Sequence, residues 1–339
     1  SKEPDQDISS NPIKIDYQVR PIQNDYEGFY SYEDCYFTQF KTHYARTMLP
    51  CFDDPSIRTS FTVRIKIPTT QTGISNMPIQ TTEIEGTEKI LTFLPTPKMC
   101  IYLLSICVGE FECIQSVSKS GIPVIIYTKP EIHPQLFEYI NFCTFSLDWM
   151  IEKMNVNYEL PHLQFISHKG IKIGIENYGL IALNCLENHN FLVNVLTIMN
   201  EVSHLWFGDL VSSKWWDSIW LNEGFSQFFQ YLILEDSISN GKGWATRLFI
   251  KYDGLRCLRY FNDKKVVPNE NEIDFSQNFL SSVIYIKGAF VLKMFLDIVG
   301  KDNFFRICSR YLNEYKNKSV VVSDFIKIVN ETMNEDYTN

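Results

Sequence analysis

Two short segments in the second half of the chain carry side chains that could bind a metal ion. Residues 200–204 read Asn-Glu-Val-Ser-His, and Glu223, a candidate third ligand, follows in the segment Leu-Asn-Glu-Gly-Phe. On a helix, residues four apart share a face, so two histidines at the ends of such a pentad can reach one zinc ion. A Glu directly after the first His lies beside the metal, where it can take a proton from zinc-bound water. Glu201 and His204 fit this pattern, but Asn200 stands where the first His is needed.

Helices are needed to position these side chains, and the periodicity of the second half of the chain predicts them. Apolar residues have helical spacing over residues 136–154 and 193–210, and again over 225–234, 289–299 and 304–315. The second of these segments contains the pentad. The candidate third ligand lies shortly before the third.

Short strands are predicted for the chain before these helices. Alternating or apolar runs at residues 61–67, 90–94 and 101–108 are separated by turn signals, so the first ~110 residues are predicted to be mostly β. Strand-like runs at 163–166 and 180–183 lie among the predicted helices. We therefore expect an α+β protein, with a β-rich N-terminal piece followed by an α/β domain. In that domain a small mixed sheet should pack beside the candidate metal helix.

The composition bounds the class of function. A chain of 339 residues favours two domains, and its formal net charge of -9 argues against a general nucleic-acid binder. Its 9 cysteines are scattered singly with no C-x-x-C pair, which predicts mostly reduced thiols and no zinc ribbon. No apolar run approaches the ~20 residues of a membrane-spanning helix. The sequence leaves open a cytoplasmic location and the ectodomain of a membrane-anchored protein.

The residues after the pentad extend it into a longer pattern. The run His-Leu-Trp-Phe-Gly-Asp-Leu at 204–210 leads into Lys-Trp-Trp at 214–216 and Trp-Leu-Asn-Glu-Gly at 220–224. This block closely resembles the aminopeptidase N family of zinc metallopeptidases, which are gluzincins. Further segments that resemble blocks of this family occur in family order at residues 45–55, 75–78, 95–99, 176–180 and 285–289.

The resemblance implies a metal-assisted aminopeptidase site with one zinc ion per chain. By position, His204 and Glu223 would be zinc ligands, Glu201 the general base, and Tyr285 the group that stabilises the oxyanion. Glu176 would bind the free α-amine of a peptide substrate. Without the family pattern, Tyr285 would be interpreted as a packed core aromatic and Glu176 as a solvated loop charge.

The implied substrate-binding set contains two departures from the family. Gly174 and Asn177 belong to the motif that lies along the substrate backbone, and Gln39 belongs to a segment beside the α-amine. Ile173 stands where the family has Gly, and its β-branched side chain hinders close approach of a peptide backbone. Lys41 stands where family members usually carry Glu or Gln.

Asn200 and Lys41 change the chemistry that the family pattern implies. An amide oxygen binds zinc more weakly than imidazole does, and losing even an indirect partner of a metal costs ~10–100-fold in affinity or activity. A Lys beside the α-amine places like charges ~4 Å apart, an interaction on the order of 4 kcal/mol at an effective dielectric of ~20. We expect Lys41 to pair with Glu176 and occupy the amine pocket itself. Restoring Asn200→His should recover metal more readily than activity, because Lys41 and Ile173 remain.

The resemblance assigns residues 1–110 to part of the family's N-terminal β domain and residues 111–339 to its thermolysin-like catalytic domain. The family's C-terminal helical domain is expected to be missing, so the chain is either a piece of a longer protein or a short gene product. Three functions stay open: a pseudo-peptidase with impaired catalysis, an active zinc aminopeptidase acting on peptides with a free N-terminus, and a non-catalytic scaffold or peptide-binding protein. The departures favour the first. The oligomeric state and the preferred N-terminal residue stay open.

Overall fold

The computed structural model describes residues 13–23, 26–184, 186, 190–238, 243–249, 266–267 and 283–337. The strands up to the first long helix are β1 (Ile22–Gln23), β2 (Gly28–Tyr32), β3 (Cys35–Gln39), β4 (Arg58–Thr59), β5 (Arg64–Pro68), β6 (Thr72–Ser75), β7 (Ile79–Glu85), β8 (Glu88–Phe93), β9 (Met99–Cys100), β10 (Ile106–Gly109), β11 (Glu112–Val117) and β12 (Pro123–Thr128). The later strands are β13 (Leu163–Ser167), β14 (Leu180–Leu183), β15 (Val211–Ser213) and β16 (Lys318–Val320).

The α-helices of the described residues are α1 (Leu136–Met154), α2 (Phe191–His204), α3 (Trp220–Ser237), α4 (Trp244–Phe249), α6 (Gly288–Val299), α7 (Lys301–Glu314) and α8 (Val322–Met333). Short 3-10 turns occur at η1 (Ala45–Thr47), η2 (Ile101–Leu103) and η3 (Trp216–Ser218), and a π-helical turn, η6, spans Val283–Lys287.

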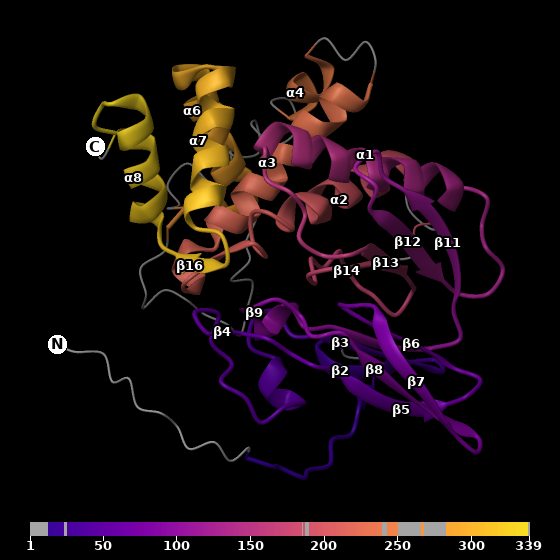
Figure 1. Ribbon diagram of the computed structural model, residues 1–339. Helices are drawn as coiled ribbons and strands as arrows, with labels where there is room; N and C mark the ends of the chain where they lie inside the picture. The colour runs from indigo at the N-terminus through magenta and orange to yellow at the C-terminus, as the bar shows by residue number, and fades with distance from the viewer. Residues whose placement is uncertain are drawn as a thin grey trace.

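The first portion of the chain forms the β-rich layer drawn in indigo and purple at the bottom of Figure 1. One sheet has the order β1-β2-β3-β10-β6, and a second has the order β5-β8-β7. The three-stranded sheet buries Ile67, Leu91 and Phe93 on one face. Strand β7 is exposed along its length, because its sequence is rich in Thr, Gln and Glu. The predicted β-rich N-terminal piece is confirmed.

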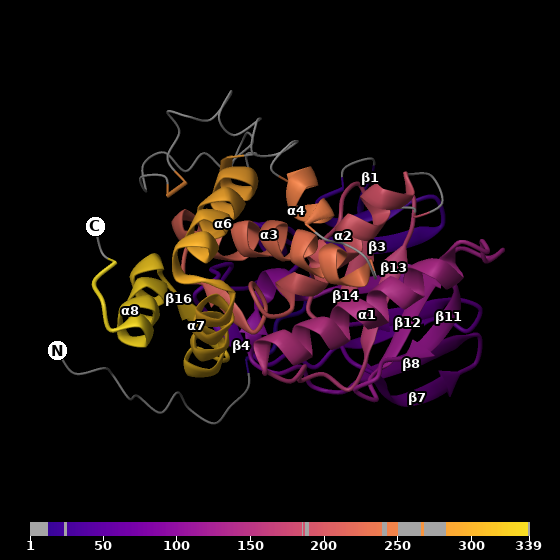
Figure 2. The same cartoon turned by 90° about the horizontal axis from the view of Figure 1, so that it is seen from above.

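A mixed sheet of order β11-β12-β13-β14 underlies the helices of the second portion. Strands β11 and β12 pair antiparallel, whereas β12, β13 and β14 run parallel. Strands β13 and β14 are buried along their whole length, as expected of parallel strands that are covered on both faces. Helix α1 packs on β11 and β12, and α2 packs on β14 (Figure 2). The predicted α/β domain with a mixed sheet is therefore present.

Two predicted elements have other limits in the structure. The helix predicted over residues 193–210 ends at His204. The chain then turns toward β15, and Gly208 within this turn has a φ of 147° that no helix accommodates. The strand predicted over residues 101–108 divides into η2 and β10, with the Leu104 N–H donating to the Ile101 carbonyl at 3.0 Å. An uninterrupted apolar run does not distinguish these conformations.

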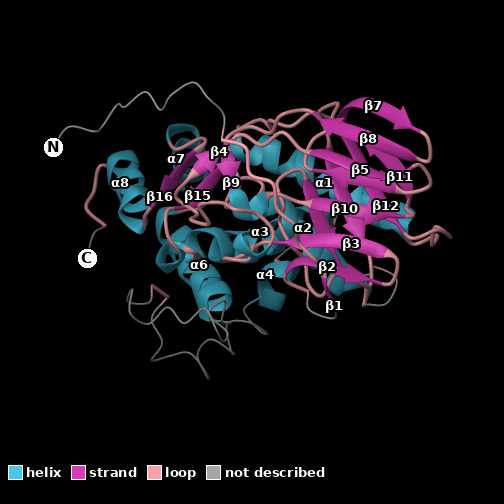
Figure 3. Cartoon of the chain, turned by 90° about the horizontal axis from the view of Figure 1, so that it is seen from below, coloured by secondary structure: helices cyan, strands magenta, loops and turns pink. Residues whose placement is uncertain are grey.

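Helices α6, α7 and α8 form a group beside α3 and away from the large sheets (Figure 3). Stacked aromatic rings join this group to the end of α2. The Phe207 ring lies 4.4 Å from Phe225 and 5.1 Å from Phe229, both on α3, and 6.3 Å from Tyr311 on α7. Because Phe207 follows α2 directly, this stack fixes the C-terminal end of α2 against α3.

The cysteines within the described residues form no disulfide with one another. They are Cys35, Cys51, Cys100, Cys107, Cys113, Cys143 and Cys308. Cys185 and Cys257 lie outside the described residues. Among the residues that the structure describes, no helix combines the length and the apolar composition needed to cross a membrane.

Candidate active site

A cavity of about 510 Å³ lies between the β-rich first portion and helices α2 and α3. The first portion contributes Glu27, Gln39, Lys41, Thr42 and Tyr44, and the segment before β14 contributes Ile173, Gly174, Ile175 and Glu176. The helices and η6 contribute Thr197, Asn200, Glu201, His204, Glu223, Gln227, Gln230 and Tyr285. The two portions of the chain thus share one site.

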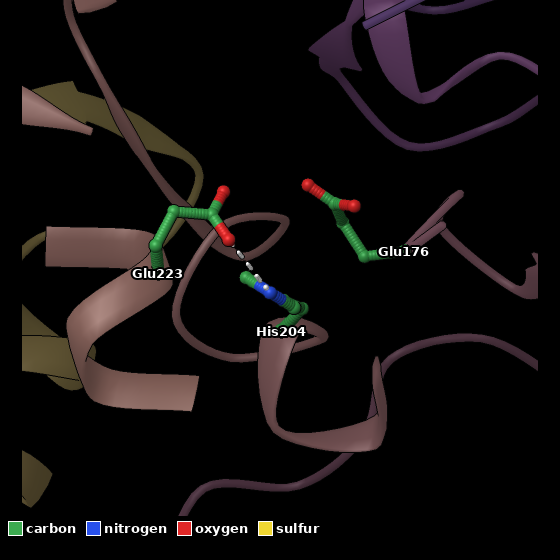
Figure 4. Close-up of side chains that lie close together, drawn as sticks. All are labelled: Glu176, His204 and Glu223. Atoms are coloured by element: carbon green, nitrogen blue, oxygen red, sulfur yellow. Dashed lines mark ion pairs between the residues drawn. The ribbon is translucent and has the colours of Figure 1, made fainter. Parts of the chain in front are cut away.

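Glu176, His204 and Glu223 all line this cavity, and their side chains point toward one another (Figure 4). One ligand atom from each lies within 4.8 Å of the others, and all three residues are buried. His204 ends α2 and Glu223 lies in the first turn of α3, which places the imidazole Nε2 3.4 Å from a Glu223 carboxylate oxygen. The other imidazole nitrogen, Nδ1, lies 3.1 Å from the Phe207 carbonyl oxygen. This spacing would allow a metal ion to contact all three groups.

A contact between two glycines brings Tyr285 to the same group. A Cβ atom on Gly224 of α3 would lie only 3.1 Å from backbone atoms of Gly288, the first residue of α6. The absence of side chains therefore lets the two helices approach closely at this point. Tyr285 lies on the π-helical turn before α6 and lines the cavity, and its hydroxyl pKa is raised by burial and by the Glu223 charge.

Lys41 enters this site from the segment that follows β3. Its Nζ donates to a Glu176 oxygen at 2.6 Å and to a Glu223 oxygen at 2.7 Å. The side chains of Lys41, Glu176 and Glu223 are 9%, 3% and 1% exposed. The predicted Lys41–Glu176 pair is confirmed. The second contact, with the carboxylate of the candidate metal ligand, was not expected from the sequence.

The ammonium and the carboxylates shift one another's ionisation. Burial lowers the pKa of Lys41, but the charges of Glu176 and Glu223 outweigh it and raise the pKa well above its usual range. Burial raises the pKa of Glu223, but Lys41 and His204 outweigh it and lower the pKa to about 2. Burial likewise lowers the pKa of His204, yet Glu223 and Glu176 raise it to about 9. Two carboxylates and two cations therefore share the buried site.

Glu201 lies against Gly174 on the cavity wall. A Cβ atom at Gly174 would meet the Glu201 carboxyl oxygen at 2.3 Å, so a larger residue there would force the Glu201 side chain to shift. The second Glu201 oxygen is buried without a hydrogen-bond partner. Burial, the largest effect, raises the pKa of Glu201 to about 8, and Glu176 adds to that increase while His204 opposes it.

Asn200 lies one turn before His204 on α2, and its side chain is directed to α3. Its amide nitrogen donates to the Ser226 hydroxyl at 3.2 Å, and that hydroxyl donates to the Glu223 carbonyl oxygen at 3.0 Å. Asn200 thus joins the two helices through neutral hydrogen bonds.

Of the residues predicted for the site, all line the cavity except Asn177. Gln39 is almost fully buried, and its side-chain oxygen has no hydrogen-bond partner. Ile173 is 58% exposed at the rim of the cavity. Asn177 is fully buried behind the wall, and both of its side-chain polar atoms are without partners.

Several cavity residues were not predicted from the sequence. Gln227 and Gln230 follow Glu223 on α3 at spacings of about one and two turns, and Thr197 precedes Glu201 by one turn on α2. Helical spacing from the predicted residues would have identified these three. Thr42 and Tyr44 carry no such signal, because they follow β3 in an irregular segment.

Comparison with known protein families agrees with this arrangement. Residues 139–339 match the Peptidase family M1 domain, and residues 2–103 match the Peptidase M1 N-terminal domain. The chain belongs to peptidase family M1. The resemblance to the aminopeptidase N family is thereby confirmed, and the β-rich portion and the α/β portion follow the M1 order of N-terminal and catalytic domains.

Curated relatives of this M1 chain are named as aminopeptidases. It is 29% identical to the puromycin-sensitive aminopeptidase of Caenorhabditis elegans over 94% of its own length and 36% of that protein. It is 30% identical to aminopeptidase M1 of Arabidopsis thaliana over 85% of its length and 34% of that protein. Probable aminopeptidase 2 of Sulfurisphaera tokodaii is 29% identical over 92% of the chain and 42% of that protein. The chain is thus aminopeptidase-like, and it spans roughly two fifths or less of the length of these relatives.

The resemblance implies a zinc ion at this site. Whether Glu176, His204 and Glu223 can bind one depends on the contacts that they already make. Glu176, His204 and Glu223 could hold a metal ion by their spacing. However, the ammonium of Lys41 lies on an oxygen of both carboxylates. Zinc sites use three or four protein ligands that are free to bind the metal. As these residues lie, they do not fit a zinc ion, and no catalytic step through a metal follows from this arrangement.

Proposed function

We propose that this chain is an M1 aminopeptidase homologue with strongly impaired catalysis, a pseudo-peptidase. The observation that carries the proposal is the Lys41 ammonium, which lies 2.6 Å from Glu176 and 2.7 Å from Glu223. Those are the residues that the family resemblance assigns to the substrate amine and to zinc. Asn200 adds to the effect, because it replaces a His ligand by a neutral amide that is hydrogen bonded to Ser226.

Under this proposal the remaining family residues keep their positions but no longer catalyse peptide hydrolysis. His204 and Glu223 are the remaining members of the ligand set, Glu201 stands at the position of the general base, and Tyr285 at that of the oxyanion group. The place of Tyr285 on the cavity wall and the two contacts of Lys41 support this assignment. Ion pairs of Lys41 with Glu176 and Glu223, and of His204 with Glu223, join these side chains to one another.

The same contacts bear on which peptides the cavity would bind. A free N-terminus would bring a second ammonium to Glu176, beside Lys41. Like charges ~4 Å apart repel by roughly 4 kcal/mol at an effective dielectric of ~20, less any screening. Gln39 and Glu201 each present a buried oxygen without a partner, so polar groups of a bound peptide would find hydrogen-bonding groups there. Binding of peptides without cleavage is therefore the form of activity that we propose.

An active zinc aminopeptidase is the second candidate, and one observation favours it. Glu176, His204 and Glu223 converge within 4.8 Å, and Glu201 and Tyr285 line the same cavity. That candidate requires Lys41 to leave both carboxylates.

Release of a fluorogenic amine from aminoacyl substrates, with zinc present, separates the two candidates. We expect no release above that of the Glu201→Ala variant. Release that is lost in Glu201→Ala would refute the proposal. A triple variant, Lys41→Gln with Asn200→His and Ile173→Gly, serves as the matched comparison, because it restores the family residue types in the same chain length. Activity in the triple variant alone would assign the loss to these three positions.

We also propose the division of the chain into residues 1–110, part of the family's N-terminal β domain, and residues 111–339, the catalytic domain. Both portions contribute to the cavity, so the site depends on their association. Limited proteolysis would test the division: we expect the first cleavage in folded protein near residue 110, and a first cleavage inside either sheet would contradict it.

A further inference from the structure

We propose that the Lys41 ammonium is the resident cation of this site and that Lys41, rather than Asn200, decides whether the site takes up a divalent metal ion. The inference rests on the proposed function, in that it explains how the M1 site lost its metal. It also revises the expectation from sequence that Asn200→His recovers metal more readily than activity.

The first argument is that the ammonium and a metal ion compete for the same oxygens. At 2.6 Å and 2.7 Å, the contacts of Lys41 with Glu176 and Glu223 are short, charge-assisted hydrogen bonds. A zinc ion binds carboxylate oxygens at about 2.0–2.2 Å, so it would have to occupy almost the same volume. Sharing the carboxylates would place a double and a single positive charge next to each other in a buried site, where repulsion is strong.

The second argument is that Lys41 is held in the site by its own backbone. Phe40, the preceding residue, is fully buried in the main core, and its carbonyl accepts a hydrogen bond from the Tyr44 N–H at 3.0 Å. Gln39 ends β3, which pairs with β2 and β10. The backbone that carries Lys41 is therefore held next to the cavity, which keeps its ammonium within reach of both carboxylates.

The third argument is that the chain retains enough ligands without a second histidine. Zinc sites that react with water use three protein ligands, and Glu176, His204 and Glu223 supply three groups within 4.8 Å. Asn200 lies outside this trio and is hydrogen bonded to Ser226. Removal of the ammonium would therefore leave a three-ligand set that differs from the family set by using Glu176.

The experiment measures binding of Zn²⁺ by calorimetry to untagged full chain that has been treated with a chelator, with Co²⁺ absorption as a check on coordination. Lys41→Met should bind one Zn²⁺ per chain at least ~100-fold more tightly than wild type, and His204→Ala in that background should abolish it. Asn200→His alone should resemble wild type. Lys66→Met is the matched control, because the Lys66 ammonium also bridges two carboxylates, Glu85 and Glu88, but on the surface.

Two results would overturn the inference: one Zn²⁺ bound by Asn200→His with Lys41 intact, or no gain in folded Lys41→Met over Lys66→Met. The first result is decisive even where Lys41→Met fails to fold. Addition of Zn²⁺ to Lys41→Met should also raise its thermal midpoint, since a ligand that binds only the folded state stabilises it.

Metal binding and turnover are separate measurements. Turnover by wild type without bound metal would refute the pseudo-peptidase proposal and leave this inference intact. Metal uptake by inactive wild type would refute this inference and leave the pseudo-peptidase proposal intact.

Discussion

Two lysines in this protein each bridge two carboxylates, and only their surroundings differ. Lys66 lies 3.0 Å from Glu85 and 2.9 Å from Glu88, with all three side chains about half exposed. Lys41 makes the same pattern with Glu176 and Glu223 where water has almost no access. Water compensates each charge separately in the first case. In the second, the buried charges are compensated only by one another. Removing one charge should therefore cost little stability at Lys66 and much more at Lys41.

The two bridges also differ in what assembles them. Lys66 and its partners belong to neighbouring strands β5, β7 and β8, so the local pairing of one small sheet brings them together. Lys41 is separated by 135 residues from Glu176 and by 182 from Glu223. The buried bridge therefore requires the complete arrangement of both portions of the chain.

The largest effect is expected from Lys41→Met. Removing one member of a buried ion pair leaves the other charge without compensation and costs about 3–5 kcal/mol. Here two buried carboxylates lose their cation, so we expect a loss at the upper part of that range in the free energy of unfolding. Urea denaturation at neutral pH in the presence of a chelator measures it. A loss under about 1 kcal/mol would mean that water reaches the site and that the contrast with Lys66 is false.

The pH dependence of stability should come from the buried site. His204 has its pKa raised from 6.5 to about 9, and its contribution is full below pH 6.5 and lost as pH rises through 9. Glu201, raised from 4.5 to about 8, holds in the folded state a proton that the unfolded chain has released. Both groups make stability fall as pH rises from 6.5 to 8, by up to about 1.4 kcal/mol per pH unit for each proton.

Glu223 works in the opposite direction at low pH. Its pKa is lowered from 4.5 to about 2, so its contribution is present above pH 4.5 and lost as pH falls toward 2. Urea midpoints measured across pH 3–9 should therefore pass through a maximum, and Glu201→Gln should make the decline between pH 6.5 and 8 shallower. A flat profile in wild type would contradict both assignments.

A smaller effect is expected from Arg58, a third cation whose partners are neutral. Its guanidinium donates to the Ser212 hydroxyl at 2.6 Å and to the Asp209 carbonyl at 2.7 Å, which joins β4 of the first portion to the chain after α2. Hydrogen bonds from a charged group contribute about 1.5–3 kcal/mol, so Arg58→Ala should cost about 2 kcal/mol in unfolding free energy. Arg58→Lys should recover part of it. A cost equal to that of Lys41→Met would show that charge pairing is not what distinguishes Lys41.

The smallest effect is expected from Lys66→Met. Its urea midpoint should match that of wild type within error, and added salt should shift the two midpoints equally, because an exposed ion pair contributes little and is screened. A clear loss of stability would show that exposure does not separate the two bridges.

The sequence predicted which residues line the cavity better than it predicted the contacts that these residues make with one another. Helix α1 has the predicted limits, since its apolar spacing runs unbroken over Leu136–Met154. The Lys41–Glu176 pair followed from the family positions and from opposite charge. The contact of Lys41 with Glu223 did not follow, because it depends on how α3 sits against the segment after β3. The end of α2 was missed because periodicity continues past His204 while the conformation of Gly208 does not.

The anchoring of Lys41 in the first portion has a consequence for how the chain is made. Synthesis delivers residue 41 long before residue 223, so the lysine emerges and stays hydrated until the helices of the second portion exist. The bridge is then among the last contacts to close. A contact absent from the folding transition state affects the unfolding rate and leaves the folding rate almost unchanged. We expect Lys41→Met to accelerate unfolding selectively in stopped-flow urea jumps, and an equal slowing of refolding would show that the bridge forms early. Lys41, which we propose keeps a metal ion out of the site, would then also set the lifetime of the folded protein.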